Sequence, residues 1–209
     1  MNQSKTLEEY FNELSSNSPT PGGGNVAALC GTLSASLGIM VCNLTIGKKK
    51  YAEVEAEMIK LKEELESYQK KFIDLGTRDN EAFDKVMAAF KLPKESDTEK
   101  EERLRKIEEA TIGAAEVPIE VIIATGEILP LIKTIIEKGN KNSLSDAGVA
   151  VSLADTAAKG AYLNVLINCA SLSNQTIANE IKKRTDIRME EISRETAILF
   201  GMVMKAINQ

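Results

Sequence analysis

Residues 18–51 decide the fold. Ser18-Pro19-Thr20-Pro21-Gly22-Gly23-Gly24-Asn25 is followed by a run from Val26 to Ile46 without a charged residue, and then by Gly47-Lys48-Lys49-Lys50-Tyr51. A turn rich in proline and glycine before an uncharged run predicts a loop that opens a helix. The run is long enough to cross a bilayer. However, it is the one such run in the chain, and its Ala, Gly, Ser, Cys and Thr content favours a buried helix of a soluble bundle.

The two ends of this run indicate a site for a negatively charged small molecule. The free N–H groups of a helix start point back at Gly22, Gly23 and Gly24 and favour an anion there. Lys48–Lys50 place three ammonium groups at the other end. The alternatives are a turn that only starts the helix and lysines that only complement its C-terminus. The pattern is neither a P-loop nor GxGxxG.

Composition narrows the chemistry. The 209 residues suit one domain over 1–209, and 26 basic against 31 acidic residues give a net charge of −5, which argues against nucleic acid and anionic membranes as partners. The three cysteines lack CxxC spacing, and no cleavable apolar N-terminus is present, so we expect a cytoplasmic protein. The chain has no histidine, which excludes Ser–His and Cys–His catalysis and His-ligated zinc.

Helical spacing runs through almost the whole chain. Thr6-x-x-Glu9 is typical of a capping box before a short helix with the apolar face Leu7, Tyr10, Phe11 and Leu14. One long helix is expected from Tyr51 to about Phe90, with apolar residues alternating four and three apart.

After a loop at 92–97, a further helix begins near Thr98, and Pro118 and Pro130 should kink or divide it. Its inward residues are expected to be Leu104, Ile107, Ala110, Ala114 and Val117. The break at 139–143 precedes helices over about 145–171 and on to about 206. The sequence therefore predicts an all-α bundle of long, partly kinked helices.

Three polar positions interrupt this apolar pattern. Continuing the alternation past Leu75 places Asp79 at an inward position, where a carboxylate needs a ligand, donors or a structural arginine. Asp146 opens a helix among small residues, which is also ordinary helix-dipole chemistry. Asn164 lies about 27 Å further along that helix, so one small ligand in one chain cannot touch both residues. Interhelical hydrogen bonding is the alternative for Asn164 and Asn168, unless a second subunit brings them to a site.

Several motifs in order carry a resemblance to a known family. Residues 18–28 and 43–51, Arg78-Asp79-Asn80-Glu81-Ala82-Phe83, Leu92-Pro93-Lys94, 115–118, 139–146 and 160–168 resemble the cyclodeaminase/cyclohydrolase family of folate enzymes. This family includes the C-terminal half of formiminotransferase-cyclodeaminase and its stand-alone bacterial relatives. Asn25 stands where relatives often have serine, and either residue caps a helix.

The resemblance implies an all-helical, dimeric, metal-free enzyme of one-carbon folate metabolism without a separate cofactor. A cyclodeaminase closes 5-formiminotetrahydrofolate to 5,10-methenyltetrahydrofolate and releases ammonia. A cyclohydrolase opens the methenyl bridge with water to 10-formyltetrahydrofolate. We favour the cyclodeaminase narrowly, since the two reactions share nearly the same chemical apparatus and the sequence does not distinguish them. The missing transferase half raises the cyclohydrolase as the alternative. A non-catalytic scaffold dimer is the alternative from another class; it predicts an arginine on Asp79 and no pocket beside Gly22–Gly24.

The same resemblance, together with the missing histidine, selects the candidate residues. Asp79, Asp146 and Lys49 are the expected catalytic groups: one carboxylate supports the cationic carbon, and the other moves protons with a lysine. The expected folate-binding residues are Pro21, Gly22, Gly23, Gly24, Asn43, Lys48, Lys50 and Asn164. The glycine turn and the lysines would hold the carboxylates of a folate tail, polyglutamylated tails included.

Overall fold

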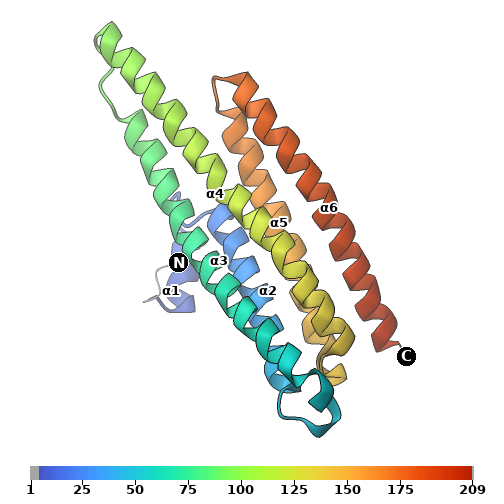
Figure 1. Cartoon of the computed structure of the whole chain (residues 1–209). Helices are drawn as coiled ribbons and strands as arrows, with labels where there is room; N and C mark the ends of the chain where they lie inside the picture. Colours follow the sequence, from blue (N-terminus) through green and yellow to red (C-terminus); the bar gives the residue numbers. More distant parts are fainter. Residues whose placement is uncertain (1–4, 209) are drawn as a thin grey trace.

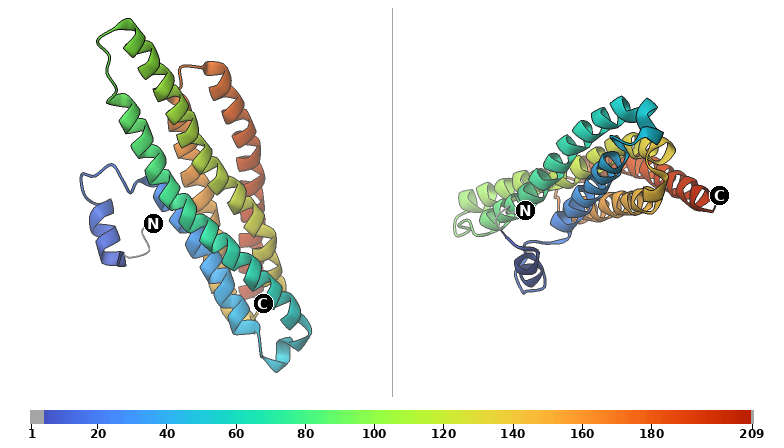
Figure 2. Two further views of the ribbon diagram at one scale, coloured as in Figure 1. Left: turned by 60° about the vertical axis from the view of Figure 1, so that its left-hand side comes forward. Right: turned by 90° about the horizontal axis from the view of Figure 1, so that it is seen from below.

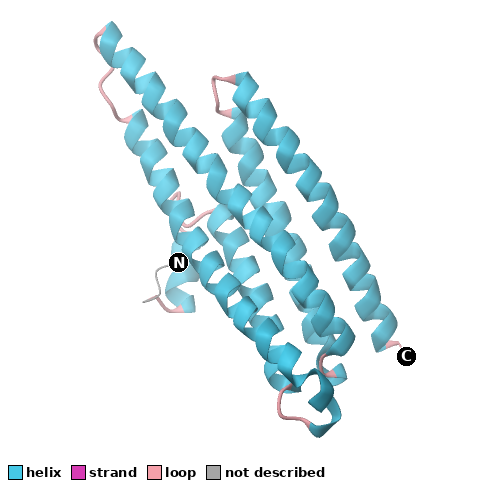
Figure 3. Cartoon of the chain, viewed as in Figure 1, coloured by secondary structure: helices cyan, strands magenta, loops and turns pink. Residues whose placement is uncertain are grey.

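In the computed structural model, which describes residues 5–208, the chain is all-helical, as predicted, and no strand lies in this range (Figure 3). The helices are α1 (Leu7–Leu14), α2 (Gly23–Thr45), α3 (Glu55–Phe90), α4 (Asp97–Lys138), α5 (Leu144–Ala170) and α6 (Gln175–Ile207). Short 3-10 segments, η1 (Lys49–Val54) and η2 (Lys141–Ser143), join α2 to α3 and α4 to α5.

The five long helices form one elongated bundle (Figure 1). Seen end-on, α2 and α5 lie on one side, with α3 and α4 behind them and α6 against α5, while α1 hangs from the side of the bundle (Figure 2). α2 and α5 run antiparallel, because Gly23 lies beside Asn164 at one end and Leu44 accepts a hydrogen bond from Asn140, just before α5, at the other.

Small residues let α2 pack closely against α3. A Cβ added to Gly31 would lie 2.5 Å from the ring of Phe72 on α3, and one added to Gly38 would lie 2.9 Å from Leu65. Glycine is therefore needed here for close approach. Among the described residues the one positive φ belongs to Gly47 (76°), so Gly22–Gly24 do not use the left-handed conformations that glycine permits.

Two expected helices differ in detail. α3 begins at Glu55, because Tyr51 lies in η1 with φ −117° and ψ 17°, where its hydroxyl accepts the backbone N–H of Lys141 at 3.0 Å. The capping box on Thr6 forms, but α1 buries only Tyr10, and Leu7 and Phe11 are exposed. The expected inward position of Leu104 is also wrong, because the α3–α4 hairpin projects beyond its neighbours and leaves this side chain in solvent (Figure 1).

Neither proline divides α4. Pro118 has no N–H to give to the Ala114 carbonyl one turn earlier, and the side-chain amide of Asn168 on α5 donates to that carbonyl at 3.1 Å. An interhelical hydrogen bond thus replaces the missing one within α4. This is the structural role expected as the alternative for Asn168.

α2 meets the length and apolar composition of a membrane-crossing helix, and it is the one such helix in the described range. Of its most apolar window, 56% is buried against other helices. That burial is typical of a core helix.

Candidate active site

A cleft of about 370 Å³ opens beside the glycine turn, where the start of α2 meets α3 and the end of α5. The predicted residues Gly22, Gly23, Gly24, Asp79 and Asn164 all line it. The scaffold interpretation predicted that no pocket would open here, and this expectation is wrong. Pro21 is buried behind the turn and instead lines a smaller cavity under α1.

The side chain of Asp79, which belongs to α3, lies against the N-terminus of α2. A Cβ added to Gly24 would lie 2.1 Å from Oδ1 of Asp79, so the carboxylate rests directly on the glycine backbone. The backbone N–H of Asn25, in the first turn of α2, donates to the carboxylate. These N–H groups have no partner within the helix, and the helix dipole favours negative charge at this end. The anion that the glycine turn attracts is therefore the protein's own Asp79.

This placement argues against the expectation that the glycine turn holds the carboxylates of a folate tail. A second anion beside Asp79 would be repelled, whereas a cation would be attracted. The cleft therefore fits the cationic end of a ligand.

Burial raises the pKa of the Asp79 carboxyl above its ordinary value, and the Asn25 N–H opposes part of that rise. The alternative of a structural arginine is wrong. The neighbouring Arg78 turns to Glu120 on α4, with Nη2 at 2.5 Å from Oε1, and no ion pair of Asp79 occurs in the described range. A carboxylate without a cationic partner, in a cleft, is available to a cationic ligand.

The cleft has one apolar wall, which sequence reasoning missed. Phe83, Val86, Met87 and Phe90 follow Asp79 along α3 and line the cleft. Their spacing of three, one and three residues puts them on one face of the helix. Phe90 and Met87 are 48% and 39% exposed, because the projecting hairpin has no helix in front of it. The signal in the sequence is this apolar stripe directly after an inward carboxylate, at the end of the expected helix.

Asn164 adds a polar group to the opposite wall. Its amide nitrogen donates to Gly160 at 2.8 Å within α5 and lies against Gly23. Because the nitrogen is engaged, the amide oxygen is left to accept from a ligand.

The other predicted residues lie at the far end of α2. Asn43 and Lys48–Lys50 are exposed there, and Asp146 is half-buried in the first turn of α5. The 23 residues of α2 separate them from the glycine turn by about 34 Å. Within one chain the structure does not bring Asp146, Asn43 or the lysines to the cleft. It forms two clusters, one at each end of α2.

Comparison with known proteins agrees with this fold. The formiminotransferase-cyclodeaminase family model matches residues 6–187. A methenyltetrahydrofolate cyclohydrolase of Methylorubrum extorquens is 40% identical over 204 residues, which cover 98% of each protein. A formimidoyltransferase-cyclodeaminase of Rattus norvegicus is 28% identical, and the match spans 36% of its length.

A solved structure has the same architecture. The crystal structure of a formiminotetrahydrofolate cyclodeaminase from Thermotoga maritima superposes with a TM-score of 0.81 at 32% identity, covering 98% of this chain and 96% of that one. With the family model spanning most of the sequence and relatives matching along its whole length, the chain belongs to the formiminotransferase-cyclodeaminase family of folate enzymes.

Proposed function

We propose that this chain hydrolyses 5,10-methenyltetrahydrofolate to 10-formyltetrahydrofolate. Water adds to the cationic carbon between N5 and N10, the bond from that carbon to N5 breaks, N5 keeps one proton, and one proton is released. The observation that carries this choice is the 40% identity to a cyclohydrolase of the same length, with 98% of both chains covered.

The cyclodeaminase reaction, which the sequence narrowly favours, is the second candidate. The solved relative of matching length is a formiminotetrahydrofolate cyclodeaminase and is 32% identical. In this reaction N10 attacks the formimino carbon of 5-formiminotetrahydrofolate, and the bond from that carbon to its outer nitrogen breaks as ammonia leaves. Both reactions pass through a tetrahedral carbon between N5 and N10, so one cleft can serve either.

The charges of the cleft support a role for Asp79 beside the reacting carbon. Its carboxylate faces a cavity that is lined by no cationic side chain of residues 5–208, and a cationic methenyl or amidinium group would neutralise it. Phe83 and Phe90 offer flat apolar surface for the aromatic part of a folate. No metal takes part in this proposal, so turnover should survive chelation by EDTA.

Proton transfer is assigned to Asp146 and Lys49, and the tail to Lys48, Lys50 and Asn43, all from a second subunit. We place the two-fold axis of this dimer beside Ser34, the midpoint of α2, because an axis there would pair the helix antiparallel with its copy. The Lys48–Lys50 end of one subunit then lies beside the Gly22–Gly24 end of the other. Asp146 would lie at the same shared site, because the start of α5 is at the lysine end of α2.

The surface of the bundle supports such a dimer. The outer sides of α2 and α5 expose apolar residues, each between 37% and 65% accessible: Leu33, Met40, Leu44, Val149, Leu163 and Ile167. α2 carries no charge from Val26 to Ile46, so nothing in it opposes burial against a second copy. Exposed apolar side chains on neighbouring helices are typical of interaction sites.

The assay that separates the reactions uses purified protein and each folate. Loss of methenyl absorbance with production of 10-formyltetrahydrofolate supports the cyclohydrolase. Gain of methenyl absorbance with release of ammonia from 5-formiminotetrahydrofolate supports the cyclodeaminase. Turnover of neither folate would refute both. Fractionation of cells that make the protein would test the expected cytoplasmic location.

Mixing two inactive variants tests the shared site. Asp79→Asn and Asp146→Asn homodimers should each be inactive. If each site takes Asp79 from one subunit and Asp146 from the other, unfolding and refolding the variants together gives heterodimers with one intact site. Random pairing then restores about 25% of the parent rate, because half the dimers carry half their sites. No recovery, with heterodimers shown by mass spectrometry, would contradict the shared site.

A further inference from the structure

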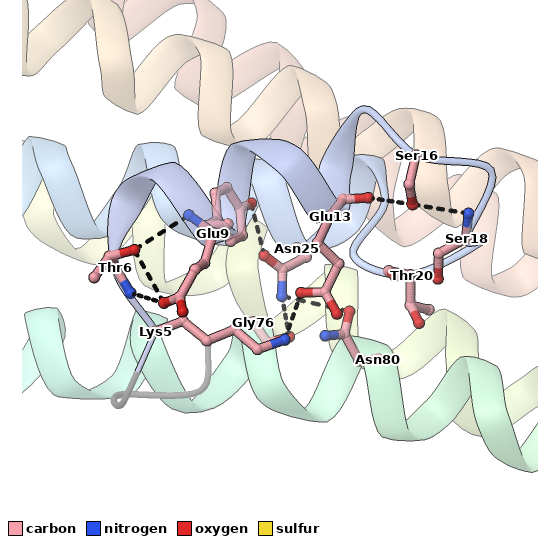
Figure 4. Close-up of polar contacts among 11 residues, drawn as sticks. Lys5, Thr6, Glu9, Glu13, Ser16, Ser18, Thr20, Asn25, Gly76 and Asn80 are labelled. Atoms are coloured by element: carbon pink, nitrogen blue, oxygen red, sulfur yellow. Dashed lines mark hydrogen bonds and ion pairs between the residues drawn. The ribbon is translucent and has the colours of Figure 1, made fainter.

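The short helix α1 meets the bundle through one buried side chain. Of its eight residues, Tyr10 alone is buried. The Tyr10 hydroxyl donates to the side-chain oxygen of Asn25 at 2.9 Å. Figure 4 shows Asn25 between α1, which carries Glu9 and Glu13, and α3, which carries Gly76 and Asn80. α1 is thus joined by a buried hydrogen bond to the first turn of α2.

Asn25 is held on all sides. Its side chain is 1% exposed, and its amide nitrogen donates to the Gly76 carbonyl at 2.6 Å and to the Asn80 side chain at 3.4 Å. Gly76 and Asn80 bracket Asp79 on α3. Asn25 therefore contacts this part of α3 in two ways. Its side chain binds Gly76 and Asn80, and its backbone N–H donates to the Asp79 carboxylate.

We infer that Tyr10 is a positioning residue for Asp79: through the Asn25 side chain it fixes the first turn of α2, whose N–H groups hold the carboxylate in the cleft. Tyr10 lines the small cavity under α1 and not the cleft, so it acts without touching a ligand there. The consequence for turnover rests on the proposed role of Asp79 in the reaction, whereas the hold on the carboxylate does not.

The groups around Asp79 leave the Asn25 N–H as its main donor. On α1 and α2, burial raises the pKa of Tyr10 and of Cys30, so both stay neutral at neutral pH. On α3, Arg78 is engaged by Glu120 of α4. On α5, the cleft presents the uncharged Asn164 and Asn168. Loosening the first turn of α2 therefore weakens the stabilisation of the charged carboxylate and raises its pKa.

The test is Tyr10→Phe, which keeps the ring and removes the hydroxyl. Tyr162→Phe is the matched control. The Tyr162 hydroxyl donates to Asp186 over 2.6 Å, and neither residue lines the cleft. Carbon-13 NMR of the aspartate carboxyls, with the Asp79 resonance assigned from Asp79→Asn, measures the pKa directly. Tyr10→Phe should raise the pKa of Asp79, shift the acidic limb of kcat/KM to higher pH, and lower kcat about tenfold with little change in KM. Tyr162→Phe should do none of these.

A double variant shows whether the effect passes through Asn25. In an Asn25→Ala background, Tyr10→Phe should add no further shift. A parent-like Asp79 pKa in Tyr10→Phe, or an equal shift in Tyr162→Phe, would overturn the inference. If the parent turns over neither folate, the proposed function fails, while the NMR titration still decides whether Tyr10 holds Asp79.

Discussion

Gly24→Ala is the smallest change that should disable the cleft. The added methyl carbon would lie 2.1 Å from Oδ1 and 2.6 Å from Cγ of Asp79, where ordinary contact begins at 3.4 Å. The carboxylate must therefore retreat by more than 1 Å, because the other party to the contact is helix backbone. That retreat breaks the hydrogen bond from the Asn25 N–H and moves the charge away from the reacting carbon.

A displacement of about 1 Å at a reacting group costs on the order of 100-fold in rate, or about 2.7 kcal/mol of transition-state stabilisation. We expect kcat/KM with 5,10-methenyltetrahydrofolate to fall by about that factor, mostly through kcat. Methenyl absorbance gives the rate, and circular dichroism with thermal unfolding reports whether the bundle is intact.

Gly113→Ala is the control for adding a methyl group to a helical glycine. Nothing lies within 4 Å of a Cβ at Gly113 on α4, so this variant should be more stable by about 0.5–1 kcal/mol and fully active. If Gly24→Ala kept the parent kcat/KM while folded, Asp79 would not be the carboxylate that serves the reaction.

Three further predictions follow from the same contacts. Because burial raises the folded-state pKa of Asp79, ionisation of its carboxyl opposes folding above that pKa. Asp79→Asn should therefore have a higher melting temperature than the parent at pH 7.5, and this gain should vanish near pH 4. The same variant should lose about 100- to 1000-fold in turnover. Phe90→Ala should raise KM several-fold with little change in kcat, whereas Leu104→Ala on the same hairpin, outside the cleft, should change neither. Asn168→Ala should lower the free energy of unfolding by about 1–3 kcal/mol in urea titrations, and less in a Pro118→Ala background, where residue 118 regains the N–H for Ala114.

Local patterns were enough to predict most of the helices. The capping box at Thr6 forms between residues three apart, and the apolar seam of α3 buries Met58, Leu61 and Leu65. These features depend on neighbours in the sequence, and periodicity reports them directly. The prediction that Leu104 points inward was wrong, because its exposure depends on how far the α3–α4 hairpin projects. No spacing within α4 reveals that.

The candidate site depended on contacts between helices, and there the sequence was less informative. It identified Gly24 as part of a helix start and Asp79 as an inward carboxylate. It did not show that the Asp79 carboxylate lies against the Gly24 backbone. It placed the glycine turn and the lysines in one site, although the length of α2 keeps them about 34 Å apart. Asn168 likewise acquired its role from Pro118 on another helix.

The charges at the two ends of α2 have the order that its dipole favours. The carboxylate of Asp79 sits at the N-terminus, and Lys48–Lys50 follow the C-terminus, so the helix dipole favours the sign of the charge at each end. A folate has the opposite need, since its methenyl carbon is cationic and its tail is anionic. One α2 cannot serve both ends of a small molecule, because its own ends are too far apart. Two antiparallel copies can, since each pairs the carboxylate end of one helix with the lysine end of the other, and this complementarity is the physical reason to expect the dimer.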